Sequence, residues 1–362
     1  MAEIYVRPVG RVSPAPKRAI GHPERVVRIA GRQDLAFSAF EAIERHGDGW
    51  VDRRQISLDD TTALLQSSRS STDRLKTLLE RISAPRGDVA GLPLDRPRIM
   101  GIVNVTPDSF SDGGRHFSPK AAIEHALKLE AEGADILDIG GESTRPGSDA
   151  VPIDVELKRV VPVLQGLAGK VRARLSVDTR KAEVMREAAR AGAHILNDVS
   201  ALSHDPVSLR AAADTGLSVV LMHAQGGPKS MQANPRYADV VLDVFAALEE
   251  RVEACVRAGI PRQKLIADPG IGFGKTLEHN LQLLASLTLF HALGTGLLVG
   301  ASRKSFIGAL TGAVDPDERL PGSLAAACMA AGAGAQIIRV HDVAATRQAL
   351  TTWEAMSAGQ AP

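Results

Sequence analysis

The hydrophobic positions of this chain follow two different patterns, and the change falls near residue 97. Before it, apolar residues are scattered among polar residues and prolines. After it, short runs of Val, Ile and Leu recur, each followed by a polar or glycine-containing loop and then by apolar residues at helical spacing. This alternation predicts parallel strands joined by helices. The strands are expected at 99–105, 136–139, 175–177, 195–196, 218–222, 265–267, 297–299 and 336–340.

The number of these repeating units predicts a closed barrel. Helices are expected between the strands, for example at 120–132, 180–191, 237–258 and 320–333. Eight strand–helix units over roughly 260 residues fit a (β/α)8 barrel, which typically needs about 250. An open doubly wound sheet is the alternative, but it would carry a glycine-rich turn after the first strand, where this chain has Asn-Val-Thr-Pro-Asp. We therefore expect an α/β barrel at 96–358.

The first 95 residues contain no recognisable chemical motif. Leu75, Leu78, Leu79 and Ile82 lie at helical spacing and predict a helix at 71–82. A short helix is also expected at 37–43. We expect residues 1–95 to form a small, mainly helical or irregular extension of unknown role, with a partner-binding module as the alternative.

Composition excludes several classes of function. The net charge is +1, from 43 basic and 42 acidic side chains, and aromatic residues make up 3%, so a nucleic-acid surface is not expected. No apolar run is long enough for a membrane span, and the N-terminus has no signal core; an organelle transit peptide is the less favoured alternative. Cys255 and Cys328 are expected to be buried free thiols. Together these features favour a cytoplasmic protein.

Polar side chains gather where the predicted strands end, which in such a barrel is the active-site face. Helix capping explains Asp, Asn and Ser at these places, but it does not explain the positively charged groups Arg145, Lys304, Arg339 and His341. The residues at or just after the strand ends are Asn104, Asp138, Asp178, Asn197, Asp198, Met222, His223, Asp268, Ser302, Lys304, Ser305, Arg339 and His341.

The chemistry of this set predicts a substrate with a heterocycle and an anion. Asp178, Asn197 and Asp268 supply acceptors that suit the N–H groups of a flat, amino-bearing ring. The second set, Arg145 and His341 together with Arg339, supplies donors and positive charge for a pyrophosphate or another dianion. Lys304 could serve either end.

Other polar residues have simpler interpretations. The stretch 270–276 looks like a nucleotide loop, but Pro269 stands where a Walker pattern needs glycine, and we expect its glycines to let the backbone approach a flat ligand. His223 is expected to be structural. Arg180 and Lys181 are expected to be helix-surface charges, and Asp198 is expected to orient Asn197 or the rim.

Eight segments resemble the dihydropteroate synthase family closely, in the family's order. They are IMGIVNVTPDSFSDGG (99–114), ILDIGGESTRPG (136–147), SVDTRK (176–181), ILNDVSA (195–201), LMHAQG (221–226), ADPGIGFGK (267–275), GASRKSFIG (300–308) and IRVHD (338–342). The chain departs from the family at Ala224, where many members have methionine, and in its long N-terminal region.

The resemblance implies three groups of site residues and one metal. The pterin-binding group is Asp178, Asn197, Met222, Asp268, Phe273, Lys304 and Arg339, the last stacked on the ring. The pyrophosphate group is Asn104, Thr144, Arg145 and His341, with Mg²⁺ on the pyrophosphate and Asn104 as its nearest protein contact. The p-aminobenzoate group is Phe110, Pro146, Lys304 and Ser305, where sulfonamides are expected to compete.

The resemblance also implies a mechanism and a homodimer. The pterin methylene–pyrophosphate bond is expected to break first, with Asp178, Asp112, Arg145 and Lys304 as the catalytic residues and with loops 106–114 and 143–147 closing over the substrates. The arylamine then attacks the methylene. Two other functions remain open: a related methyltransferase acting between a folate and a corrinoid protein, and a pterin-binding pseudoenzyme.

Overall fold

The computed structural model of the chain describes residues 3–12, 26–58, 60–61, 70–106, 119–143, 147–227, 231 and 234–359. A closed barrel of eight parallel strands forms its centre, so the predicted fold of this part is confirmed. Around the barrel the strands are β5 (Arg98–Asn104), β6 (Ile136–Gly140), β7 (Arg174–Asp178), β8 (Ile195–Asp198), β9 (Ser218–Met222), β10 (Leu265–Asp268), β11 (Gly296–Val299) and β12 (Ile337–Val340).

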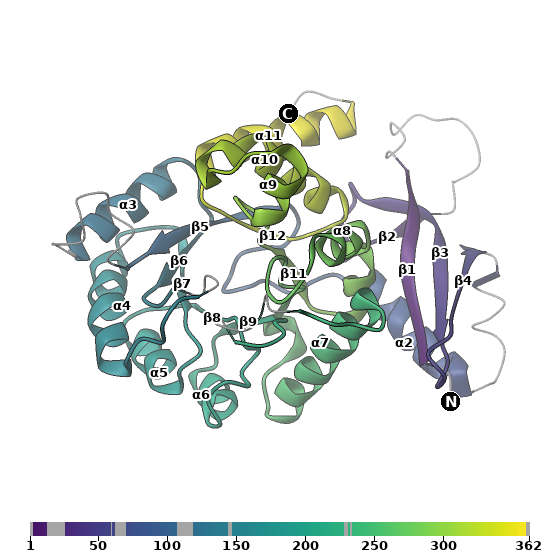
Figure 1. Cartoon of the computed structure of the whole chain (residues 1–362), viewed down its shortest axis with the longest axis horizontal. Helices are drawn as coiled ribbons and strands as arrows, with labels where there is room; N and C mark the ends of the chain where they lie inside the picture. Colours follow the sequence, from purple (N-terminus) through teal and green to yellow (C-terminus); the bar gives the residue numbers. More distant parts are fainter. Residues whose placement is uncertain are drawn as a thin grey trace.

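Helices surround the barrel, as Figure 1 shows. Several of their ends are fixed by side chains: Asp239 accepts the backbone N–H groups of Val241 and Leu242 at the start of α7. Cys255 of α7 is buried as predicted, whereas Cys328 of α10 is only partly buried. The helices are α3 (Pro119–Ala131), α4 (Ile153–Leu167), α5 (Ala182–Arg190), α6 (Ser208–Thr215), α7 (Val240–Arg257), α8 (Leu277–Ala285), α9 (Ser305–Thr311), α10 (Leu320–Gly332) and α11 (Val343–Ala358), with short 3-10 turns η2 (Arg262–Lys264), η3 (Leu287–Leu293) and η4 (Pro316–Arg319).

The barrel interior is apolar at the end where the strands begin. Val89 and Leu94, from the segment just before β5, pack onto this layer and close that end. Because successive strand residues face opposite sides, the residues two and four places further along also point inward, and they include Asp138, Asn197, Asp268 and Arg339. The apolar layer consists of Met100, Ile136, Ile195, Val220, Ile266, Leu298 and Ile337.

The N-terminal region is a small antiparallel sheet, so the prediction of a mainly helical or irregular extension is wrong. Its strands are β1 (Glu3–Val12), β2 (Val27–Arg28), β3 (Ala36–Arg45) and β4 (Val51–Ser57). The segment 37–43, expected to be a short helix, lies within β3. One helix in this region was predicted correctly: α2 (Ser70–Ser83) covers the expected range 71–82.

Non-local pairing explains why the local pattern was misleading. β3 pairs with β1 along its whole length and with β4 along most of it, so Phe37 and Phe40 are buried in the middle of a sheet. The spacing of apolar residues within 37–43 fits a helix, but β-propensity depends on cross-strand neighbours that lie tens of residues away. Pairing with β1 therefore outweighs the local preference.

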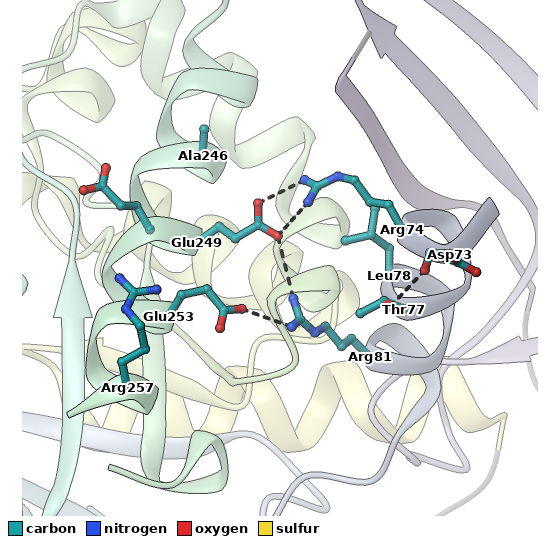
Figure 2. Close-up of a pocket in the computed structure, with 10 residues that line it drawn as sticks. Asp73, Arg74, Thr77, Leu78, Arg81, Ala246, Glu249, Glu253 and Arg257 are labelled. Atoms are coloured by element: carbon teal, nitrogen blue, oxygen red, sulfur yellow. Dashed lines mark hydrogen bonds and ion pairs between the residues drawn. The ribbon is translucent and has the colours of Figure 1, made fainter. Parts of the chain in front are cut away.

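The sheet and α2 pack against the outside of the barrel beside α7 and η3 (Figure 1). The ring of Tyr5 meets the edge of Phe245 with centroids 5.5 Å apart. Figure 2 shows the ion pairs between α2 and α7. Glu249 accepts hydrogen bonds from Nη1 and Nη2 of Arg74, and Glu253 accepts one from Nη2 of Arg81. A buried aromatic contact bordered by charge pairs thus fixes the sheet on the barrel.

Replacing Tyr5 with alanine is expected to weaken this attachment. Tyr5 is 1% exposed, so Tyr5→Ala should lower the free energy of unfolding by about 3 kcal/mol. Trp50→Ala is the control, because Trp50 is 66% exposed and its loss should cost under about 0.5 kcal/mol. Urea unfolding of both variants measures the difference, and equal costs would contradict the packing described here.

Candidate active site

A buried aspartate lies at the centre of the polar layer. Asp138 of β6 is fully buried and accepts hydrogen bonds from Ser176 Oγ at 2.6 Å and Asn197 Nδ2 at 2.9 Å. Its ionic partner is Arg339 of β12, whose Nε lies 2.7 Å from the carboxylate. The same guanidinium donates through Nη2 to Asp178 at 2.9 Å. Four strands are therefore tied to one carboxylate–guanidinium–carboxylate network.

This network sets the charge of the site. Burial raises the pKa of Asp178 to about 7, with Asp138 acting in the same direction and Arg339 opposing both. Burial also acts to lower the pKa of Arg339, but the two carboxylates outweigh it and raise that pKa. Arg339 keeps 22% of its side chain exposed. The hydrogen bonds from Nε and Nη2 fix the plane of the guanidinium. Stacking of a flat ring on this plane stays a prediction.

A second group of residues approaches from β9, β10 and α9. Asp268 pairs in register with Met222 and accepts the N–H of Gly270 at 2.7 Å. Burial raises the pKa of Asp268 to about 6, opposed by Gly270, Lys304, Lys275 and Arg339 in that order. The ammonium of Lys304 lies 4.0 Å from the centre of the Phe273 ring. All seven residues of the predicted pterin group thus lie at the carboxyl ends of the barrel strands or just after them, at the polar end of the barrel that we call its mouth.

Two of the three glycines in the segment after β10 serve a different purpose from the one predicted. A Cβ on Gly270 would lie 1.9 Å from the carbonyl oxygen of His223, and one on Gly274 would lie 2.4 Å from that of Gln225. Both residues also have positive φ, at 67° and 63°. They allow the chain to approach its own backbone after β9 rather than a ligand.

Of the predicted pyrophosphate group, the structure describes Asn104 and His341. Asn104 is half-buried at the end of β5, where it pairs with Gly140. His341 Nδ1 lies 3.1 Å from Ser302 Oγ. Burial, assisted by Arg339, lowers the pKa of His341 to about 3, so its imidazole is a neutral donor rather than the expected cation. Ser305 is exposed at the first position of α9.

Five predicted site residues fall outside the part of the chain that the structure describes. They are Phe110, Asp112, Thr144, Arg145 and Pro146. Most of the two loops at 106–114 and 143–147 lies outside it as well.

The interpretation of Arg180 and Lys181 as helix-surface charges was wrong. Lys181 is buried and paired with Glu142 and Glu156, and Arg180 also pairs with Glu142, so neither is a free surface charge. Asp198 was expected to orient Asn197 or the rim, and the second alternative holds. It faces away from Asn197, because neighbouring strand residues point to opposite sides, and it accepts from Ser200 and Leu202 in the loop after β8.

Asp138 was named from the sequence only as one of the polar residues at the strand ends. A charged residue inside the apolar run Ile-Leu-Asp-Ile-Gly must have partners when the strand is buried, and that was the available signal.

The described residues contain no group of three or more His, Cys, Asp or Glu side chains that could hold a metal ion. This does not conflict with Mg²⁺, which keeps several waters and often binds through one or two protein oxygens plus substrate phosphates. The amide oxygen of Asn104, half-buried at the mouth, fits that limited role. Among the described helices, none has both the length and the apolar character needed to cross a bilayer.

The cavity drawn in Figure 2 is separate from this mouth. It has a volume of about 580 Å³ and lies between α2 and α7 on the outside of the barrel. Its charged residues, such as Arg74 and Glu249, are paired with each other across it. It therefore belongs to the attachment of the N-terminal sheet rather than to the strand ends.

A family model described as "Pterin binding enzyme" matches residues 100–341, which hold both groups of site residues. The dihydropteroate synthase of Escherichia coli K12 is 54% identical over 264 residues, covering 73% of this chain and 93% of that protein. The chain belongs to the dihydropteroate synthase family.

Solved structures of the family match the barrel of this chain. One is Xanthomonas albilineans dihydropteroate synthase with 4-aminobenzoic acid, at 54% identity and a TM-score of 0.71, covering 76% of this chain and 98% of that one. Another is the same organism's enzyme in complex with 7,8-dihydropteroate, at 52% identity and a TM-score of 0.69, covering 76% of this chain and 99% of that one.

Neutralising Asp138 is expected to destabilise the barrel. In Asp138→Asn the half-buried Arg339 loses its fully buried anionic partner, which should cost about 3 kcal/mol of unfolding free energy. Asp154→Asn is the control, because Asp154 is an exposed carboxylate at the start of α4. If calorimetry finds the same melting temperature for both variants, the network does not have the central role described.

Proposed function

We propose that this chain condenses 6-hydroxymethyl-7,8-dihydropterin pyrophosphate with p-aminobenzoate to give 7,8-dihydropteroate and pyrophosphate. The observation that carries the proposal is the buried network of Asp138, Arg339 and Asp178, with Asn197 and Asp268 beside it, at the mouth of a pterin-binding barrel. Carboxylate and amide oxygens held in this way are acceptors for the N–H groups of a pterin. Membership of the family supports the reaction.

In this proposal the pterin lies between the two groups of side chains. Asp178, Asn197 and Asp268 bind its polar edge, and Arg339 stacks on one face. Met222 and Phe273 shape the pocket, and Lys304 contacts the ring from the side of Phe273. The buried partners of these residues keep them in place before the substrate arrives, which lowers the cost of binding.

Asn104, Thr144, Arg145 and His341 are proposed to hold the pyrophosphate. The neutral imidazole of His341 donates a hydrogen bond, and Arg145 supplies the positive charge. Mg²⁺ held by Asn104 and the phosphate oxygens would neutralise charge on the pyrophosphate.

The reaction is proposed to be a dissociative substitution at the pterin methylene. The C–O bond breaks and its electron pair leaves with pyrophosphate, which Arg145 and His341 stabilise. Asp178, with Asp112 from the first loop, stabilises the positive pterin fragment. The amino nitrogen of p-aminobenzoate then bonds to the methylene carbon and loses a proton. Closure of loops 106–114 and 143–147 keeps water from capturing the cation.

The second substrate is proposed to lie outside the pterin, against Phe110, Pro146, Lys304 and Ser305. The exposed position of Ser305 at the start of α9 agrees with a subsite on the solvent side of the mouth. Sulfonamides, which resemble p-aminobenzoate in shape and charge, are proposed to compete there.

We further propose that 96–358 is the catalytic domain and that 1–95 is an accessory domain. A homodimer is supported by exposed apolar side chains on three neighbouring helices: Leu277 and Leu281 of α8, Leu310 of α9 and Met329 of α10. The two free cysteines agree with a reducing compartment such as the cytoplasm.

One assay tests the reaction. Supplying the pterin pyrophosphate, p-aminobenzoate and Mg²⁺ should yield dihydropteroate and pyrophosphate in equal amounts. A pterin-binding pseudoenzyme would bind the pterin without turnover. A methyltransferase would instead demethylate a methylated folate in the presence of a corrinoid acceptor.

Asp178→Asn is expected to lower turnover about 100-fold, because a neutral amide no longer stabilises the cationic fragment. The fold should survive with a lower free energy of unfolding, because Arg339 keeps its ion pair with Asp138 and asparagine is nearly the size of aspartate. Asp154→Asn on the outer surface again serves as the control. Steady-state kinetics at saturating substrate measure the effect, and wild-type turnover would refute the electrostatic role.

The pH dependence follows from the raised pKa values. Asp178 and Asp268 accept pterin N–H groups most strongly when ionised, and burial raises their pKa values to about 7 and about 6. Lowering the pH through this range protonates them, so kcat/KM for the pterin substrate should fall, by up to about tenfold per pH unit. A flat profile from about pH 8 to about pH 5 would contradict this account.

A further inference from the structure

One buried lysine next to the proposed pterin subsite has no role in the mechanism above. Lys275 follows β10 by a few residues and is only 3% exposed. Its ammonium donates to the carbonyl oxygen of Phe273 at 2.9 Å and to that of His223 at 3.2 Å. It also lies 3.1 Å from His223 Nδ1. A buried ammonium held by neutral acceptors is costly, which calls for an explanation beyond chain packing.

The contacts of Lys275 join two segments that both lead into the site. Gly270 approaches the same His223 carbonyl so closely that no side chain would fit, and the hydroxyl of Tyr237 donates to the carbonyl oxygen of Gly274 at 2.8 Å. The segment after β10 is therefore fastened to the segment after β9. Phe273, at the turn of the fastened segment, is the residue whose ring faces Lys304.

The charge of Lys275 acts on Asp268 as well. The charged groups that influence the ammonium are Asp268, at the end of β10, and Lys304, just before α9. His223 adds no charge, because burial and Lys275 lower its pKa to about 3. Asp268 in turn is influenced by Lys304, Lys275 and Arg339. Lys275 thus supplies positive charge to Asp268, the carboxylate that is proposed to bind the pterin.

We infer that Lys275 is a positioning residue for the pterin substrate, which fastens Phe273 in place through two backbone carbonyls and keeps Asp268 ionised. This inference rests on the proposed function, because it assumes that Asp268 and Phe273 meet a pterin. A neutral donor such as glutamine could make the backbone contacts alone. The lysine charge has a separate purpose only if the ionisation of Asp268 matters.

The ionisation ranges agree with this role. Burial lowers the pKa of Lys275 to about 7, while that of Asp268 is raised to about 6. Over the range in which Asp268 titrates, Lys275 therefore carries its charge. Removing that charge would raise the pKa of Asp268 further and weaken pterin binding at neutral pH.

Two substitutions separate the fastening contacts from the charge. Lys275→Gln keeps an N–H donor without the charge, and Lys275→Met removes both. Lys264→Met is the matched control, because Lys264 precedes β10, is exposed, and donates to the carbonyl oxygen of Gly216 at the opposite end of the barrel. Melting temperature, the KM of each substrate and the pH profile of kcat/KM are measured for all three.

For Lys275→Gln we expect the acidic limb of kcat/KM for the pterin substrate to move up by about one pH unit, with about a tenfold rise in the pterin KM at neutral pH. The KM of p-aminobenzoate should change less than about twofold. Lys264→Met should match the wild type. If the Lys275 variants lose only thermal stability and keep the wild-type pterin KM and acidic limb, Lys275 is structural and the inference fails.

A measurement on the unaltered protein keeps the test decisive if the variants do not fold. Nuclear magnetic resonance of the lysine ammonium groups follows Lys275 while 6-hydroxymethylpterin is added. Because the pterin draws Asp268 into its ionised form, the pKa of Lys275 should rise on binding; an unchanged titration would overturn the inference. Wild-type protein that makes no dihydropteroate would instead refute the proposed function itself.

Discussion

The structure depends above all on one buried ionic interaction, the guanidinium of Arg339 held between the carboxylates of Asp138 and Asp178. Two negative charges against one positive charge leave the network with spare hydrogen-bond acceptors, and both carboxylates are buried. The same burial that raises the pKa of Asp178 makes its charge more effective toward a bound ligand. Asn197 and Ser176 join the network through Asp138, so four strands of the barrel contribute to one rigid receptor.

Much of this arrangement could be predicted from the order of residues alone. Strand periodicity and the rule that barrel sites lie at the carboxyl ends of strands bring Asp178, Asn197, Asp268 and Arg339 together without reference to any relative. The pairings inside the site could not be predicted. Whether Asp138 or Asp198 supports Asn197 is decided by which face of its strand each residue occupies, and a shift of one position reverses the answer.

The N-terminal region shows the opposite case. Its residues 37–43 have a spacing that suits a helix, yet their conformation is decided by β1, which is distant in the sequence. The glycines after β10 were misinterpreted for a similar reason, because the surface they approach is the chain itself at His223 and Gln225. Close approaches between segments far apart in sequence are invisible to local patterns. The loops that carry Asp112 and Arg145 lie outside the described residues, so their part in the site rests on the family resemblance.

The central claim is that the pterin binds to ionised carboxylates whose pKa values are raised by burial. Calorimetric titration of the wild-type protein with 6-hydroxymethylpterin near pH 6, in buffers of different ionisation enthalpy, counts the protons exchanged on binding. Carboxyl groups that are partly protonated in the free protein must ionise to bind the pterin N–H groups well, so the account predicts release of between about one and two protons per bound pterin. Proton uptake, or no exchange, would contradict it.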